Sequence, residues 1–155
     1  MRDDDQKTPQ STARIAGHPI HPMLVPFPIA CFAGTLLCDI AYAATAQMQW
    51  SNMAAWLLAV GLVISIFVVV AGAIDFLGDR RIRNLQAAWI HSVGNGVALC
   101  LAILDLLVHS RDAYTSVMPE GLGLSVLVVL ILFVTGWNGW TMVYRHGVGV
   151  RPENR

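Results

Sequence analysis

The chain has 155 residues, of which 55% are hydrophobic and only 13% are charged, and its formal net charge is zero. Ordinary soluble domains contain about 25% charged residues, so this composition excludes a typical soluble domain. No basic block exceeds three residues, which argues against a nucleic-acid-binding surface.

Four hydrophobic stretches follow a polar leader. Residues 1–16 have no hydrophobic periodicity, which predicts a disordered tail. The stretches are residues 25–46, 53–74, 87–104 and 122–143. Each is close to the ~20 residues that cross a bilayer, where the backbone must satisfy its own hydrogen bonds, so each is expected to be a helix. Short connections predict an all-α integral membrane four-helix bundle with up-down-up-down topology over residues 17–150, followed by a tail at 151–155.

The basic residues predict the orientation of this bundle. Nine of the ten Lys and Arg residues lie before the first stretch, between the second and third, or after the fourth. Arg111 is the exception. The positive-inside rule therefore places both termini in the cytoplasm.

The segment just before the first stretch contains two His-Pro pairs, His18-Pro19 and His21-Pro22. A residue that precedes proline is disfavoured in the α region, so we expect this segment to be non-helical. In a polyproline II conformation the two imidazoles would point the same way, roughly 9 Å apart.

The third stretch carries a regular polar face. Spacings of 4, 3, 4, 3 and 4 connect His91, Asn95, Ala98, Ala102, Asp105 and His109. This spacing places the six residues on one side of a helix. Because polar groups are costly against lipid, the face is expected to point into the bundle. No long internal repeat is recognised elsewhere in the chain.

Several polar residues are expected near the cytoplasmic face. They are His18, His21, His91 and His146, with Asp75, Asn95 and Asn138 at nearby depths. Imidazole is the commonest side-chain metal ligand, and paired imidazoles hold haem iron. The candidate axial pairs for haem b are His91 with His146 and His91 with His21. The alternative is that these histidines only make interhelical hydrogen bonds or interact with helix ends.

A second polar group is expected nearer the opposite face. Asp105 and His109 are one helical turn apart, and Asp39 lies at a similar depth in the first stretch. The group indicates either an entry point for protons or ions, or an interhelical hydrogen bond made by a protonated aspartic acid.

The residues also resemble a known family. The run GHPIHPMLVPFP at 17–28 is similar to the opening signature of a bacterial membrane family called domain of unknown function 2231. Further similar positions are Asp39, His91, Asn95, Gly139 and the ending YRHGVGV at 144–150. The resemblance covers residues 17–150 and implies a four-helix protein of the bacterial inner membrane with no established activity. Some relatives carry this module beside a Rieske iron–sulfur domain, which implies electron transfer.

The leading hypothesis from these patterns is a small redox or electron-transfer membrane protein that binds haem b or a metal ion. Its candidate ligands are His91, His146, His21 and His18. Besides the lipid bilayer, the expected partner is a redox protein or a second copy of the chain.

Two other functions fit the same residues. One is a non-enzymatic structural or assembly subunit of a membrane complex. The other is a proton- or ion-coupled conduit that uses Asp39, Asp105 and His91. The chain has no Gly-rich phosphate loop, nucleotide fingerprint or nucleophile elbow, so its motifs do not indicate an enzyme.

Overall fold

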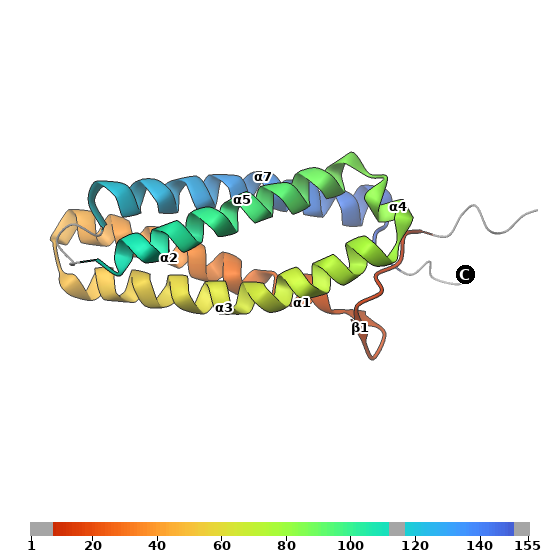
Figure 1. Ribbon diagram of the computed structural model, residues 1–155, viewed down its shortest axis with the longest axis horizontal. Helices are drawn as coiled ribbons and strands as arrows, with labels where there is room; N and C mark the ends of the chain where they lie inside the picture. The colour runs from red at the N-terminus through yellow and green to blue at the C-terminus, as the bar shows by residue number, and fades with distance from the viewer. Residues whose placement is uncertain (1–7, 112–116, 151–155) are drawn as a thin grey trace, which may run out of the picture.

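Four long helices lie side by side in the computed structural model, which describes residues 8–111 and 117–150 (Figure 1). They are α2 (Pro26–Thr45), α3 (Met48–Gly78), α5 (Gln86–His109) and α7 (Leu122–His146). All four are long and apolar enough to cross a membrane. The predicted all-α bundle with four spans is therefore confirmed.

The helices form two hairpins. Helices α2 and α3 pack together as the first hairpin, and α5 and α7 pack together as the second. The hairpins meet where α2 contacts α7 and where α3 contacts α5. The buried core between them contains Phe32, Leu58, Ala102 and Val128.

Short elements connect and cover the helices. They are β1 (Arg14–Ile15), β2 (His18–Pro19), α1 (Ile20–Leu24), α4 (Arg80–Arg83) and η1 (Val117–Gly121). Elements β1, β2 and α4 lie at the end of the bundle that carries residues 8 and 150, called here the termini end (Figure 1). The α2–α3 connection and η1 lie at the opposite end, called here the loop end.

One local prediction is wrong. Helix α1 contains His21 and Pro22, although the sequence predicts a non-helical segment there, whereas His18 and Pro19 are extended as expected. Pro22 lies in the first turn of α1, where a backbone N–H has no acceptor within the helix, so the missing N–H costs no hydrogen bond. The imidazole of His21 also bonds to α3 at 2.9 Å, which favours its position before proline.

Part of the predicted N-terminal tail is bound to the bundle. The carboxylate of Asp75 accepts hydrogen bonds from the backbone N–H groups of Thr12 and Ala13, both at 2.7 Å. Thr8 donates to the carbonyl of Val150 at 3.0 Å. The hydrogen-bonded structure therefore begins before the predicted boundary at residue 16, because α3 provides a half-buried carboxylate acceptor for the tail. Residues 1–7 and 151–155 lie outside the described residues.

The outward faces of the helices are apolar. Phe133 is 74% exposed, Trp56 is 73% exposed and Trp137 is 71% exposed. Large hydrophobic side chains over the whole outer surface are costly in water but suit the hydrocarbon of a bilayer. The small and polar side chains instead lie inside, among them Thr35 and Ala102.

Candidate functional site

Two polar clusters lie where the hairpins meet. The first, near the termini end, consists of His21 and His91 and is called the histidine pair. Their ring centroids are 6.0 Å apart and the ring planes make an angle of 76°. His21 comes from α1 at the start of the first hairpin, and His91 comes from α5 of the second. The pair therefore joins the two halves of the protein.

Each imidazole of the pair is held by a backbone carbonyl through one nitrogen. Nδ1 of His21 lies 2.9 Å from the carbonyl oxygen of Val68, and Nδ1 of His91 lies 2.8 Å from that of Thr135. A carbonyl oxygen only accepts, so each Nδ1 carries the hydrogen. In a neutral imidazole Nε2 then keeps a lone pair. Neither Nε2 atom has a hydrogen-bond partner among the described residues.

Two glycines make room for these rings. Gly72 follows Val68 by one turn of α3, and a Cβ atom there would lie 2.9 Å from Cε1 and Nδ1 of His21. Gly139 follows Thr135 by one turn of α7, and its Cβ would lie 3.2 Å from the same atoms of His91. Real Cβ atoms are almost never found this close, so a side chain at Gly72 would displace the ring.

The two hairpins repeat one arrangement. His91 follows His21 by the same number of residues as His109 follows Asp39. The residues of α1 and α2 that correspond to the polar face of α5 therefore have the same 4, 3, 4, 3, 4 spacing. The matching series in the first hairpin is His21, Val25, Pro28, Phe32, Thr35 and Asp39. Corresponding residues of the two series contact each other at both ends, His21 with His91 and Asp39 with His109. Most corresponding residues differ in type, so the match between the two series is one of spacing and not of residue identity.

The second cluster lies near the loop end and consists of Asp39, Asp105 and His109. It is called the Asp–His–Asp cluster. Nε2 of His109 lies 2.9 Å from Oδ1 of Asp39 on the other hairpin. Nδ1 of His109 lies 3.0 Å from Oδ1 of Asp105, one turn earlier on α5. All three side chains are 0% exposed.

This cluster contains all the buried charged or imidazole side chains of the described residues. Oδ2 of Asp39 and both carboxylate oxygens of Asp105 are buried without a hydrogen-bond partner. Nδ1 of His109 donates its hydrogen bond to the backbone carbonyl of Asp105, at 3.0 Å. The structure brings Asp39 and Asp105, which the sequence placed at a similar depth, to opposite nitrogens of the His109 ring. The predicted inward face of α5 is confirmed as well, because Ala98, Ala102, Asp105 and His109 are all buried.

Asn95 supports the histidine pair from the same face of α5. Its amide donates to the carbonyl of His91 at 2.7 Å, and its side-chain oxygen accepts from the hydroxyl of Thr135 at 3.2 Å. Asn95 therefore links α5 to the turn of α7 whose carbonyl holds His91. Val68, Gly72 and Thr135, which also hold the pair, were not singled out from the sequence.

The other predicted site residues lie apart from the pair. His18 is exposed in β2 and His146 is exposed at the last position of α7. No contact joins either of them to His21 or His91 within residues 8–111 and 117–150. Asn138 donates to the carbonyl of Val134 on its own helix at 2.8 Å. Of the two expected axial pairs, the structure thus brings His91 together with His21.

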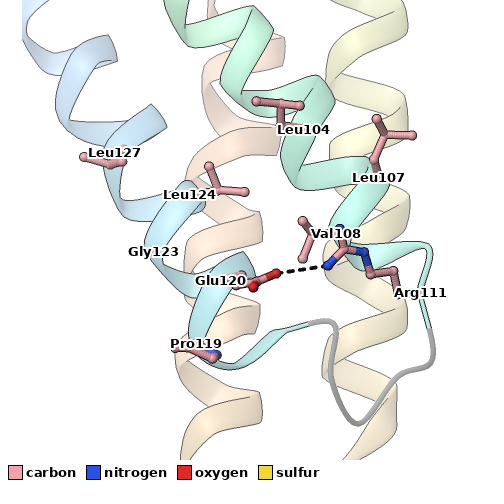
Figure 2. Close-up of a pocket in the computed structure, with 9 residues that line it drawn as sticks. All are labelled: Leu104, Leu107, Val108, Arg111, Pro119, Glu120, Gly123, Leu124 and Leu127. Atoms are coloured by element: carbon pink, nitrogen blue, oxygen red, sulfur yellow. Dashed lines mark hydrogen bonds and ion pairs between the residues drawn. The ribbon is translucent and has the colours of Figure 1, made fainter.

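A groove of about 560 Å³ lies outside both clusters, between α5 and η1–α7 at the loop end. Figure 2 shows leucines of both helices along it and the ion pair of Arg111 with Glu120 beside it, at 3.0 Å. The groove carries no histidine, cysteine or aspartate. Its walls are mostly apolar, like the lipid-facing surface, and the one carboxylate that lines it, Glu120, pairs with Arg111.

These features define a four-span membrane protein with polar side chains along the contact between two helical hairpins. The chain belongs to the family described as "Predicted membrane protein (DUF2231)", whose sequence model matches residues 17–152. The matched segment contains both clusters. No curated protein and no solved structure matches the chain significantly. The family description names no activity.

Proposed function

We propose that the protein binds a transition-metal centre, haem iron in the first place, through Nε2 of His21 and Nε2 of His91. The observation that carries this proposal is the anchoring of both Nδ1 atoms to backbone carbonyls. Histidines that bind metals usually donate their other ring N–H to a carbonyl or carboxylate, which fixes the ring and its tautomer. Both rings of the histidine pair have this support from backbone carbonyls.

The separation of the rings suits one metal atom between them. A metal–imidazole bond is about 2 Å long and Nε2 lies about 1 Å from the ring centre, so one atom between two opposed rings separates their centres by roughly 6 Å. The ring centroids of His21 and His91 are 6.0 Å apart. Neutral imidazoles do not repel each other, whereas two imidazolium ions at this distance would.

The number of ligands favours haem over a bare ion. A bare Zn²⁺ usually has three or four protein ligands, but the described residues contain no group of three His, Cys, Asp or Glu side chains arranged for a metal. Haem iron needs fewer protein ligands than a bare ion, and each of the two hairpins would supply one, His21 and His91. A haem bound here would supply one-electron chemistry. His21 and His91 would hold the iron, and Asn95 would help to fix His91.

The basic residues support an orientation for this site. Arg14, Arg80, Arg81, Arg83 and Arg145 lie in elements of the termini end, whereas Arg111 lies at the loop end and pairs with Glu120. With the positive-inside rule, the termini end faces the cytoplasm of a bacterial inner membrane. The histidine pair then lies in the inner half of the bilayer, within reach of a redox partner at the cytoplasmic surface.

The test is haem binding by four alanine variants. The protein is produced without added haem, purified in detergent and titrated with haemin while the Soret band is recorded. We expect His21→Ala and His91→Ala to weaken binding at least 100-fold, and the exposed controls His18→Ala and His146→Ala to bind like the wild type. Equal binding by His91→Ala and wild type would contradict the proposal.

A further inference from the structure

We propose that the Asp–His–Asp cluster is a proton-binding site inside the membrane that exchanges one proton with the aqueous phase at the loop end. This inference does not depend on a metal at the histidine pair. It rests on the charge of three fully buried side chains, on three carboxylate oxygens without hydrogen-bond partners, and on the position of the cluster close to one end of the bundle.

The charge of the cluster does not balance when every group is ionised. An imidazolium of His109 carries one positive charge, and the carboxylates of Asp39 and Asp105 carry two negative charges, which leaves one negative charge. No other Asp, Glu, Lys, Arg or His side chain of the described residues is buried. An uncompensated charge is expensive at membrane depth. One further proton on a carboxylate makes the cluster neutral.

The carboxylates offer a place for this proton. Oδ2 of Asp39 and both carboxylate oxygens of Asp105 are buried and accept no hydrogen bond. Both nitrogens of His109 already have hydrogen-bond partners, the backbone carbonyl of Asp105 and Oδ1 of Asp39. The same geometry argues against a metal ion in this position. The three side chains do not converge on a common point, and the described residues contain no set arranged to hold a metal.

The neighbouring helices supply no other charge. Tyr42 and Cys38 are the remaining buried titratable groups on α2 at this end. Buried Ser51 on α3 and buried Ser125 on α7 are polar but do not titrate in water. Glu120 of η1 is exposed and pairs with Arg111, as Figure 2 shows. Among the described residues, the charge of the cluster therefore depends on its own three members.

Exchange is expected toward the loop end. His109 is the last residue of α5 and the next residue, Ser110, is exposed. Asp39 lies less than two turns before the end of α2. In the other direction the hydroxyl of Thr35 donates to the backbone carbonyl of Cys31, and beyond it the core side chains Phe32 and Ala102 are apolar. The cluster is thus a one-sided proton site rather than a conduit through the membrane.

The test is infrared difference spectroscopy of the purified full chain during steps of pH. A carboxyl group without hydrogen bonds has a C=O stretching band at higher frequency than a hydrated one, so a buried proton is seen apart from surface carboxyls. We expect such a band in the wild type, titrating with pH and shifting after transfer to D₂O. We expect Asp39→Asn or Asp105→Asn to remove it, and the exposed control Glu120→Gln to leave it unchanged.

A second measurement does not depend on how the variants fold. Wild-type protein labelled with carboxyl-¹³C aspartate should show the same band at a lower frequency. A band that does not move with this label, or no high-frequency band at any pH at which the protein is folded, would overturn the proposal. A band that moves with the label but resists exchange in D₂O would overturn the proposed exchange with the aqueous phase.

Discussion

Each polar cluster joins corresponding residues of the two hairpins, but the two clusters differ in the types of residue that they join. At the termini end the corresponding residues are identical, His21 and His91. At the loop end they are complementary, Asp39 and His109. Each imidazole of the pair donates its Nδ1 hydrogen to a backbone carbonyl, and the two Nε2 lone pairs that remain cannot bond to each other. A carboxylate and an imidazole satisfy each other directly, at 2.9 Å.

The same arrangement of two helical hairpins thus supports two kinds of chemistry. The identical pair leaves two electron pairs for a third group, which is what a metal ligand set requires. The complementary residues Asp39 and His109 bond to each other and so link the two hairpins. Asp105 adds a second negative charge to the cluster, which exceeds the single positive charge of a protonated His109. The histidine pair is therefore expected to matter for binding, and the Asp–His–Asp cluster for stability and proton uptake.

The largest expected effect on stability comes from His109→Ala. This change leaves the carboxylates of Asp39 and Asp105 buried without their partner, and breaking a buried ion pair typically costs about 3–5 kcal/mol. His91→Ala removes a single hydrogen bond to a carbonyl and should cost about 1–2 kcal/mol. Thermal unfolding of both variants in the same detergent measures the difference. Equal losses would remove the distinction between the two clusters.

The next largest expected effect is on haemin affinity, in variants of the glycines that pack against the imidazoles. Gly72→Ala places a methyl group 2.9 Å from His21, and Gly139→Ala places one 3.2 Å from His91. Displacing a supported metal ligand typically lowers affinity 10–100-fold, so both variants should bind haemin more weakly, Gly72→Ala the more so. Gly136→Ala is the matched control on α7, because no atom lies within 4 Å of its Cβ position. If all three variants bind equally, the packing of the rings on α3 and α7 is irrelevant to binding.

The smallest expected effect is that of Thr135→Val. The hydroxyl of Thr135 bonds to Asn95, but His91 is held by the backbone carbonyl, which the substitution keeps. Loss of one hydrogen bond should lower the free energy of unfolding by about 0.5–1.5 kcal/mol, with haemin affinity unchanged within about twofold. Chemical unfolding and haemin titration of the same sample measure both. A large loss of affinity would mean that the side chain of Thr135, not its carbonyl, orients the ring.

The sequence predicts the spans and one face of the bundle well, because membrane helices follow simple rules of length and periodicity. The series from His91 to His109 faces inward as its spacing predicts. Asp39 could be placed beside His109 because depth in a straight helix follows from residue count. Both results rest on regular helices, in which position along the chain determines position in space.

The partner of His91 could not be predicted in the same way. His21 and His146 were both candidates, and the choice depends on whether the His-Pro segment is helical. The local rule for a residue before proline favours an extended form, but α1 places the imidazole of His21 against Gly72 and Val68 of α3. This contact depends on a distant glycine and a backbone carbonyl, which no local pattern reveals. The matched spacing of the two inward series is a signal that sequence comparison within the chain would find.

The most direct measurement is the visible spectrum of the wild-type protein, purified from cells supplied with ample haem and recorded before and after reduction with dithionite. We expect a Soret band that sharpens and shifts on reduction, together with iron near one atom per chain by elemental analysis. A featureless visible spectrum, with no iron and no other transition metal in the same sample, would contradict a metal centre between His21 and His91.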